Sequence, residues 1–356
     1  MKSTLKRPGQ SAAPASSDQW FGLLKDNTRT GGQTRPPARF PARVRWRLKP
    51  AKSIRSAPIL QNGVLYATAV EGTLHAVDVM AAKPKWKFQA PGQIHSTPSI
   101  AGGKVLFGCD DGNVYAIDAE RGSKVWAAAT SGEVWTSPVV RQGIAIFGSA
   151  DASLYAVDLN TGQQRWRTPL GGRIYSTPYA SGERLYVGCG DARLYSLNAD
   201  SGEVVWNAPT QNGIDSSPAV AGGVVLLGSE DFFFYALDAT TGAVRWKYAT
   251  GLGIVSSAAI GNGAAFFGSK DGWLYALELS SGRLRWKYHA GEAVTAPAVF
   301  LDGTVWIQAG GTLALDSASG KVRWRAGLGG AVQSAPVLTE TAVYLAGMDG
   351  ELYALE

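Results

Sequence analysis

One position of the chain carries a different side chain in almost every copy of a repeated pattern, and those side chains could form a ligand site. The position falls nine residues after a recurring tryptophan, just before a small-x-Pro element. It supplies a cation, an imidazole, two large aromatic rings, a carboxylate and an amide, and groups of this kind are typical of binding sites when they converge. The residues are Arg55, His95, Trp135, Tyr175, Asp215, Val255, Val294 (one residue early) and Gln333.

Two interpretations of this set remain open. Packing alone would repeat the same residue in each copy, so the variation suits a functional surface, but a solvated channel lining that has drifted would vary in the same way. His95 and Asp215 have the chemistry of a general base and its orienting carboxylate, yet their repeats should lie nearly opposite each other and we expect no contact. The sequence predicts no catalytic residue and a candidate ligand-binding ring of Arg55, His95, Trp135, Tyr175, Asp215 and Gln333.

A second candidate site is aromatic. Phe232, Phe233 and Trp273 fall in two turns that we expect on the same side of the molecule as the ring. Other copies have Gly, Asn or Trp where Phe232 and Phe233 stand, so at least one of them should be exposed. Exposed aromatic rings favour a protein partner or an apolar ligand, and partial packing on neighbouring loops is the alternative.

Metal, nucleotide and nucleophile chemistry find little support in the sequence. The 356 residues include two cysteines and three histidines, with no CxxC or Cys/His cluster, phosphate loop or nucleotide fingerprint. The stretch Asp110–Asn113 is too short for a calcium-binding loop of the helix–loop–helix type and is expected to form a tight turn. We therefore predict no metal site.

A repeat of about 40 residues positions the candidate residues. Each copy contains short β-branched and aromatic stretches separated by Gly or Asp turns, without a sustained helical stripe, and this period in all-β material predicts a propeller. The repeated tryptophans lie 40 residues apart, with a last interval of 38: Trp46, Trp86, Trp126, Trp166, Trp206, Trp246, Trp286 and Trp324.

Each blade should hold four antiparallel strands, A to D from the centre outward. The first Trp-bearing D strand, residues 42–49, precedes every A strand, and the last copy ends without a D strand. Pairing the two ends would complete an eighth blade and close the ring, leaving no exposed strand edge there. We predict a single eight-bladed propeller over residues 40–356 and a disordered, extended arm over residues 1–39.

The spacing Ala-x-Asp-x-x-Thr/Ser-Gly-x-x-x-Trp, as in AVDLNTGQQRW at 156–166, resembles the tryptophan-docking motif of quinoprotein-like propellers, which contain pyrroloquinoline-quinone-type repeats. The resemblance covers about residues 40–356. The leader DQWFGLLKDNTRTGGQTRPPARF is also similar to a lead-in that precedes such propellers. The resemblance implies an eight-bladed ring whose repeated tryptophans are buried in the seams between blades.

The family includes quinone-dependent dehydrogenases and catalytically silent scaffolds, such as the propeller lipoprotein of the outer-membrane β-barrel assembly machinery. Its quinone enzymes carry long inserted loops, a vicinal disulfide and calcium ligands. Here the repeats are almost free of insertions, and Cys109 and Cys189 fall in blades two and four, too far apart to bond. We expect a non-catalytic scaffold that binds a protein or small ligand on the face of the D–A and B–C loops, without a cofactor. The alternative is an enzyme at the channel mouth, either cofactor-free or dependent on pyrroloquinoline quinone with calcium, which we disfavour.

The charge pattern admits more than one partner. The net charge is +6, and basic residues flank most of the repeated tryptophans, where they would block pairing between blade edges. An anionic surface or a nucleic acid is the alternative, but no nucleic-acid module supports the latter. No signal sequence or membrane-spanning run is evident as written. We expect a cytoplasmic monomer, or a periplasmic or cell-surface protein if a leader was removed.

Overall fold

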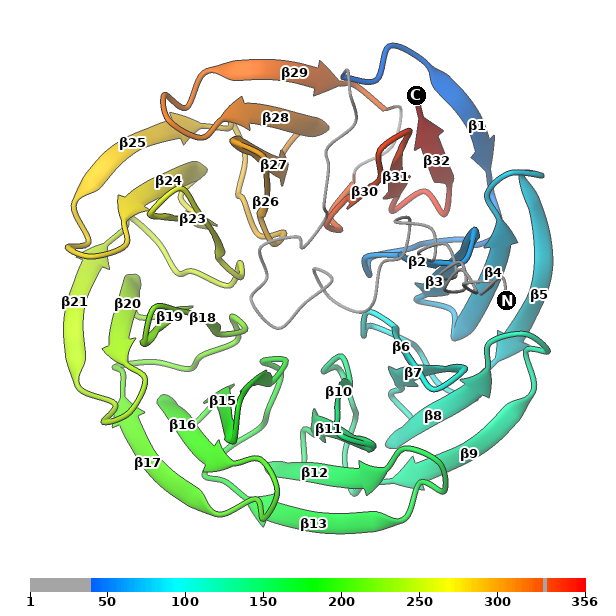
Figure 1. Cartoon of the computed structure of the whole chain (residues 1–356), viewed down its shortest axis with the longest axis horizontal. Helices are drawn as coiled ribbons and strands as arrows, with labels where there is room; N and C mark the ends of the chain where they lie inside the picture. The colour runs from blue at the N-terminus through cyan, green and yellow to red at the C-terminus, as the bar shows by residue number, and fades with distance from the viewer. Residues whose placement is uncertain (1–39, 329–331) are drawn as a thin grey trace, which may run out of the picture.

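The computed structural model describes residues 40–328 and 332–356, which form eight four-stranded antiparallel sheets arranged in a ring (Figure 1). Every regular element in these two ranges is a strand. The predicted all-β, eight-bladed propeller is therefore confirmed. The arm expected over residues 1–39 lies outside the described residues.

The eight blades repeat one meander of four strands. Blades 1 to 4 are β2 (Ile59–Gln61), β3 (Val64–Ala69), β4 (Thr73–Asp78), β5 (Lys83–Gln89); β6 (Ser99–Ala101), β7 (Lys104–Gly108), β8 (Asn113–Asp118), β9 (Lys124–Ala129); β10 (Val139–Arg141), β11 (Ile144–Gly148), β12 (Ser153–Asp158), β13 (Gln164–Pro169); and β14 (Tyr179–Ser181), β15 (Arg184–Cys189), β16 (Arg193–Asn198), β17 (Val204–Pro209). Blades 5 to 8 are β18 (Ala219–Ala221), β19 (Val224–Gly228), β20 (Phe233–Asp238), β21 (Val244–Ala249); β22 (Ala259–Gly261), β23 (Ala264–Gly268), β24 (Trp273–Glu278), β25 (Leu284–His289); β26 (Val299–Leu301), β27 (Thr304–Gln308), β28 (Thr312–Asp316), β29 (Val322–Ala326); and β30 (Val337–Leu338), β31 (Val343–Ala346), β32 (Leu352–Leu355) with β1 (Val44–Leu48).

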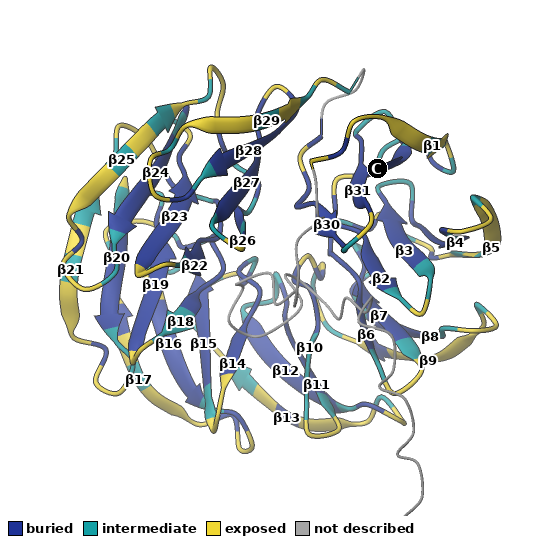
Figure 2. Cartoon of the chain, turned by 45° about the horizontal axis from the view of Figure 1, so that its top comes forward, coloured by how far each residue is buried: buried dark blue, intermediate teal, exposed yellow. Residues whose placement is uncertain are grey.

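Burial changes from the inner strands to the outer strand of each blade (Figure 2). The third strand of blade 3, β12, is buried along almost its whole length, whereas the outer strand of blade 5, β21, alternates exposed and partly buried residues. The inner strands are mostly apolar because neighbouring blades cover both of their faces. Functional side chains are therefore expected on the loops rather than on the inner strands.

The turn between the third and fourth strands explains most of the repeated motif. In blade 3, Asp158 Oδ1 accepts hydrogen bonds from the backbone N–H groups of Asn160 and Thr161, at 2.9 and 3.0 Å. Arg165, just before the tryptophan, donates to Asp158 Oδ2 at 2.6 Å. The Arg165 guanidinium and then these turn amides lower the pKa of Asp158 to about 2. Some basic residues of the outer strand thus form ion pairs with the turn of their own blade.

The tryptophan on each outer strand docks onto the next blade. Trp126 Nε1 donates to the Leu159 carbonyl at 3.0 Å, and a Cβ on Gly162 would lie 2.8 Å from the indole, so only glycine fits against this ring. Burial is uneven, however: Trp126 and Trp166 are 7% and 9% exposed, and the other six seam tryptophans are only partly buried. The expectation of a fully buried seam is wrong for those six, because the outermost strand leaves part of the indole in solvent.

The two ends of the chain complete blade 8. β1 pairs antiparallel with β32, as the blue and red strands in Figure 1 show, although β1 is shorter than the predicted 42–49. Arg43 forms an ion pair with Glu356 at 2.7 Å, and Trp324 Nε1 donates to the Pro41 carbonyl at 2.8 Å. The N-terminal strand therefore joins blade 8 and also receives the seam tryptophan of blade 7.

A ladder of hydroxyl groups links the inner strands of blades 1 to 6. In each blade a backbone N–H donates to the Ser or Thr side chain that lies 40 residues later, at the start of the next blade. The bonds are Ala57 to Thr97 (3.2 Å), Thr97 to Ser137 (3.1 Å), Ser137 to Thr177 (3.2 Å), Thr177 to Ser217 (3.0 Å) and Ser217 to Ser257 (3.1 Å). The ladder does not continue into blade 7, because Pro297 has no hydroxyl.

We expect Thr177→Val to lower the free energy of unfolding by about 1–2 kcal/mol, because it leaves the buried N–H of Ser137 without its acceptor. Thr240→Val is the matched control, since Thr240 is exposed on a turn, and it should change stability by less than about 0.5 kcal/mol. Urea unfolding of the two variants measures the difference. Equal stabilities would show that the ladder contributes nothing to cohesion between blades.

Candidate functional site

Three residues of the predicted ring, together with one neighbour, lie in contact on the D–A loops of blades 2, 3 and 4. The His95 and Trp135 ring centroids are 4.8 Å apart, and those of Trp135 and Tyr175 are 4.6 Å apart with the planes inclined by 19°. The Arg173 guanidinium carbon lies 5.1 Å from the Tyr175 centroid. We name His95, Trp135, Tyr175 and Arg173 the aromatic ledge. Its planar groups lie in a row beside the innermost strands of three blades, with Trp135 and Tyr175 stacked and His95 tilted against Trp135.

One carboxylate fixes the first two rings of the aromatic ledge. Asp110 belongs to the B–C turn of blade 2, and its Oδ1 accepts a 2.8 Å hydrogen bond from Trp135 Nε1. Its Oδ2 lies 3.5 Å from His95 Nε2. Trp135 nevertheless remains 38% exposed. A large aromatic side chain is thus held in one orientation while part of its surface stays open to solvent, which reduces the entropy lost on binding.

The carboxylate of Asp215 lies near the Arg173 end of the aromatic ledge and not near His95, with Glu230 and Lys270 as its other charged neighbours. Burial, and then the neighbouring Glu230 carboxylate, raise the pKa of Asp215, while Arg173 and Lys270 act in the opposite direction. Lys270 also forms an ion pair with Glu230. His95 therefore takes its carboxylate partner from Asp110, and the geometry offers no base-and-orienter pair between His95 and Asp215.

The remaining ring positions take no part in the aromatic ledge. Arg55 and Gln333 are exposed, and Val255 is partly buried. They share the ledge's loop position, but within residues 40–328 and 332–356 no hydrogen bond, ion pair or ring contact links them to its four residues. These contacts therefore do not form a single closed site around the whole ring.

Val294 does not occupy the ring position assigned to it. It is 1% exposed, and its N–H donates to the Ser269 carbonyl, as Ile254 donates to Ser229 one blade earlier. Val294 is therefore a core residue, and the partly buried Thr295 stands at the ring position of blade 7. The early Pro297 suggested a shift of one residue that the backbone does not make.

The aromatic residues of blades 5 and 6 differ in exposure. Phe232 is 46% exposed, so the expectation that at least one phenylalanine is exposed is confirmed. Phe233 and Trp273 are partly buried, with the ammonium groups of Lys247 and Lys287 lying 4.3 and 4.2 Å from their ring centroids. These two rings are covered on one face by cations and do not form a bare apolar patch.

Sequence comparison between blades missed Asp110, although the signal was present. The residue at this point of the B–C turn differs in each of blades 1 to 6: Val70, Asp110, Ala150, Gly190, Glu230 and Lys270. The tight turn expected at Asp110–Asn113 is present. The same test of variation that identified the ring would have identified Asp110 as well.

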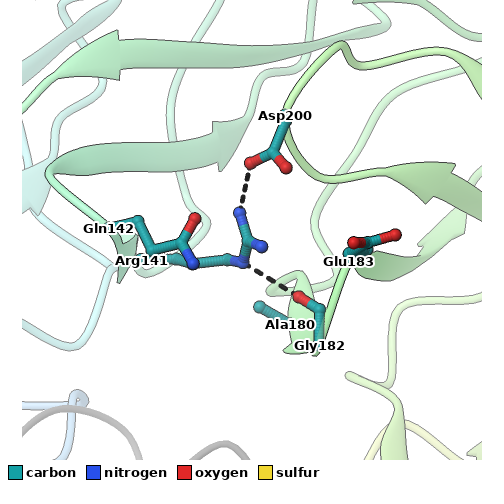
Figure 3. A pocket seen from close by; sticks show the side chains of 6 residues that line it. All are labelled: Arg141, Gln142, Ala180, Gly182, Glu183 and Asp200. Carbon is teal, nitrogen blue, oxygen red and sulfur yellow. Dashed lines mark hydrogen bonds and ion pairs between the residues drawn. The ribbon is translucent and has the colours of Figure 1, made fainter.

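Two surface hollows lie near these blades. One of about 480 Å³ adjoins the aromatic ledge and is lined by Asp110, Glu133 and the loop at Thr130. The other, of about 400 Å³, lies between the A–B turns of blades 3 and 4 (Figure 3). There Arg141 donates to the Gly182 carbonyl at 2.9 Å and pairs with Asp200, so its charge is already satisfied by the protein. The first hollow is acidic, and Asp110 joins it to the partly exposed ring of Trp135.

The residues present do not fit a pyrroloquinoline quinone site. Trp135 already stacks on Tyr175, with centroids 4.6 Å apart and planes inclined by 19°, so one face of its indole is occupied by the protein itself. Within residues 40–328 and 332–356, no group of three or more His, Cys, Asp or Glu side chains is arranged to hold a metal ion. Cys109 and Cys189 are both free and buried, and do not form a disulfide.

Burial raises the pKa of Cys109 to about 11 and that of Cys189 to about 12. We therefore expect both thiols of the native protein to react slowly with a thiol reagent at pH 8 and at once after denaturation. Above pH 9 the folded state keeps these protons while the unfolded state loses them, so the two thiols should make stability fall as pH rises. Rapid native labelling, or stability that is flat between pH 9 and 11, would contradict this.

Comparison with known proteins places this architecture among related propellers. The family profile described as PQQ_2, outer membrane protein assembly factor BamB, matches residues 41–177, 150–301 and 270–356. BamB from Moraxella catarrhalis has a similar structure, with a TM-score of 0.77 and 18% identity over 88% of this chain and 99% of that chain. A quinohemoprotein alcohol dehydrogenase from Pseudomonas putida HK5 has a TM-score of 0.80 and 15% identity over 95% of this chain and 80% of that one.

A computationally designed protein, Ika8, is also similar, with a TM-score of 0.77 and 17% identity over 86% of this chain and 98% of that one. No curated protein sequence matches the chain. At identities this low, the structural similarities establish the fold alone. The described residues include no helix of the length and hydrophobicity required to cross a membrane.

Proposed function

Because this chain belongs to the quinoprotein-like propeller family represented by the outer membrane protein assembly factor BamB, we propose that it is a non-catalytic scaffold that binds a protein partner. The binding surface is the face that carries the D–A and B–C loops. The observation that carries the proposal is the aromatic ledge, and in particular Trp135, which is fixed by Asp110 and still exposed.

The composition of the aromatic ledge supports a protein interface. Trp, Tyr and Arg are the residue types that most often dominate binding energy in such interfaces. Here all three lie side by side in a row that begins with His95. Since the row is already assembled in the free protein, a partner need not order it on binding.

The charges next to the aromatic ledge favour a partner with a cationic side chain. Asp110 and Glu133 line the adjoining hollow of about 480 Å³, and Asp110 connects it to Trp135 through the hydrogen bond from the indole. A lysine or arginine of the partner could enter the hollow while apolar atoms next to it pack on the indole.

The family also suggests a compartment. Its profile is described by a protein of outer-membrane assembly, so we propose that this chain works in the periplasm rather than in the cytoplasm. Fractionation of the source cells, with antibodies against residues 40–356, tests this directly. Recovery in the cytoplasmic fraction alone would contradict the proposed compartment.

The probe for the proposed function is the purified periplasmic portion of the barrel subunit of the outer-membrane β-barrel assembly machinery from the same organism. We expect micromolar binding that Trp135→Ala weakens at least about tenfold, with little change in melting temperature. Gln142→Ala, an exposed position on the opposite face, is the matched control. Absence of binding overturns the proposal, as does a bound quinone chromophore with alcohol oxidation after addition of pyrroloquinoline quinone and calcium.

A further inference from the structure

Phe232 stands where the backbone disfavours a large side chain. Its φ is 73°, in the left-handed region, and four of the equivalent B–C turn positions are glycines that need no Cβ: Gly72, Gly112, Gly272 and Gly350. Two further copies have only alanine, Ala152 and Ala192. The phenyl ring is also 46% exposed, so its contacts within the protein do not account for its presence.

A second exposed apolar side chain lies on the adjacent loop. Leu252 is 47% exposed in the D–A loop that leads into blade 6, where three earlier copies have glycine. Thr250 connects the two residues: its N–H donates to the Phe232 carbonyl at 2.8 Å, and its Oγ1 lies 2.8 and 2.7 Å from the carbonyl oxygens of Phe232 and Leu252. The loops that carry the two apolar side chains are thus fixed to each other by hydrogen bonds.

Two cations lie on the outer strands of blades 5 and 6, Lys247 on β21 and Lys287 on β25. Lys247 lies over the ring of Phe233, the residue next to Phe232, and Lys287 lies over the ring of Trp273. Throughout the described ranges, no carboxylate lies within ion-pairing distance of either ammonium group. The carboxylates of Asp231 and Asp271 instead accept hydrogen bonds from Tyr235, Tyr275 and the turn backbone.

We propose that Phe232 and Leu252, flanked by Lys247 and Lys287, form a docking surface for a partner segment that carries apolar side chains between acidic ones. The charge complementarity of the unpaired lysines selects the acidic segment. The inference rests on the proposed scaffold function and adds a second contact region on the same face, with charge preference opposite to that of the acidic hollow beside Trp135.

The test uses two fluorescein-labelled peptides, Asp-Leu-Glu-Phe-Asp-Leu-Glu and its basic counterpart Lys-Leu-Lys-Phe-Lys-Leu-Lys, titrated with the full chain by fluorescence polarisation. We expect the acidic peptide to bind at least about tenfold more tightly than the basic one. Phe232→Gly should weaken the acidic peptide at least about tenfold. The combined Lys247→Gln and Lys287→Gln variant should weaken it about threefold and reduce its dependence on salt.

Stability separates a docking role from a structural one. Phe232→Gly should raise the melting temperature by about 1–3 °C while it weakens binding, because glycine relieves the left-handed conformation. Ala192→Gly makes the same backbone change in blade 4, and should raise the melting temperature without altering the affinity for the peptide. A structural role for Phe232 would lower stability and binding together.

Each remaining outcome decides the proposal. Binding that Phe232→Gly leaves unchanged, equal binding of the two peptides, or no binding of either overturns it. Loss of the acidic peptide in Trp135→Ala would also overturn it, since that result places the probe on the aromatic ledge. If the barrel subunit fails to bind but the peptide results hold, the scaffold proposal fails in its named partner while this docking surface stands.

Discussion

Removal of residues 1–49 is expected to prevent folding or to lower the melting temperature by more than about 10 °C, whereas removal of residues 1–38 should change it little. The longer deletion removes β1 and so exposes β32 along its whole length. It also removes Trp46, which donates to the Val79 carbonyl at 3.0 Å across the seam to blade 1. Truncation of a fully buried tryptophan costs about 3–5 kcal/mol, and removal of a whole strand that carries a partly buried one should cost at least as much.

The shorter deletion keeps the contacts that close the ring. It leaves Phe40, which stacks on Trp324 with the planes inclined by 10°, and the Pro41 carbonyl that accepts from the Trp324 indole. Thermal melts of the two truncations and of the full chain measure the difference. Trp46→Ala in the full chain serves as an intermediate control, since it keeps the strand but removes the tryptophan from the seam. Equal melting temperatures for the two truncations would show that β1 is dispensable for closure.

Trp126→Ala is expected to destabilise the protein by about 3–5 kcal/mol, and Trp135→Ala by no more than about 1 kcal/mol. Trp126 is 7% exposed and lies between blades 2 and 3, where its truncation opens a cavity and leaves the Leu159 carbonyl without its donor. Trp135 is 38% exposed, and its removal costs mainly the hydrogen bond to Asp110 and two ring contacts.

Urea denaturation of both variants gives the two free energies. Trp126→Phe, which keeps most of the ring volume, should recover a large part of the loss and separate the cavity from the missing hydrogen bond. Similar losses for Trp126→Ala and Trp135→Ala would contradict the assignment of Trp135 to an open surface and make it a core residue. A stable Trp135→Ala with unchanged binding would instead reduce the aromatic ledge to a channel lining.

The sequence by itself determined the architecture because the same physical requirements recur in every blade. Turns such as that of Asp158 and Gly162 use a side-chain oxygen acceptor and a residue with positive φ, which is glycine in most blades, and the seam tryptophan stands at a fixed distance from them. These are local constraints, so they appear as a period of about 40 residues. The unpaired first and last strands then left one way to close the ring.

Contacts between side chains of different blades could not be obtained in this way. Sequence comparison found His95, Trp135 and Tyr175 as variable positions, but only the tertiary structure stacked them and supplied Asp110 from a separate turn. The position of Val294 was misjudged for the same reason, since a proline one residue early did not shift the backbone hydrogen bond that sets its burial.

The backbone hydrogen bond that joins the Phe232 loop to the Leu252 loop recurs in other blades, as from Thr130 to Gly112 and from Thr210 to Ala192, so this part of the arrangement does follow the repeat. Periodicity determines what each blade must share. Which side chains of neighbouring blades come into contact depends on their orientation and on the distance between them, and a repeated spacing does not encode either.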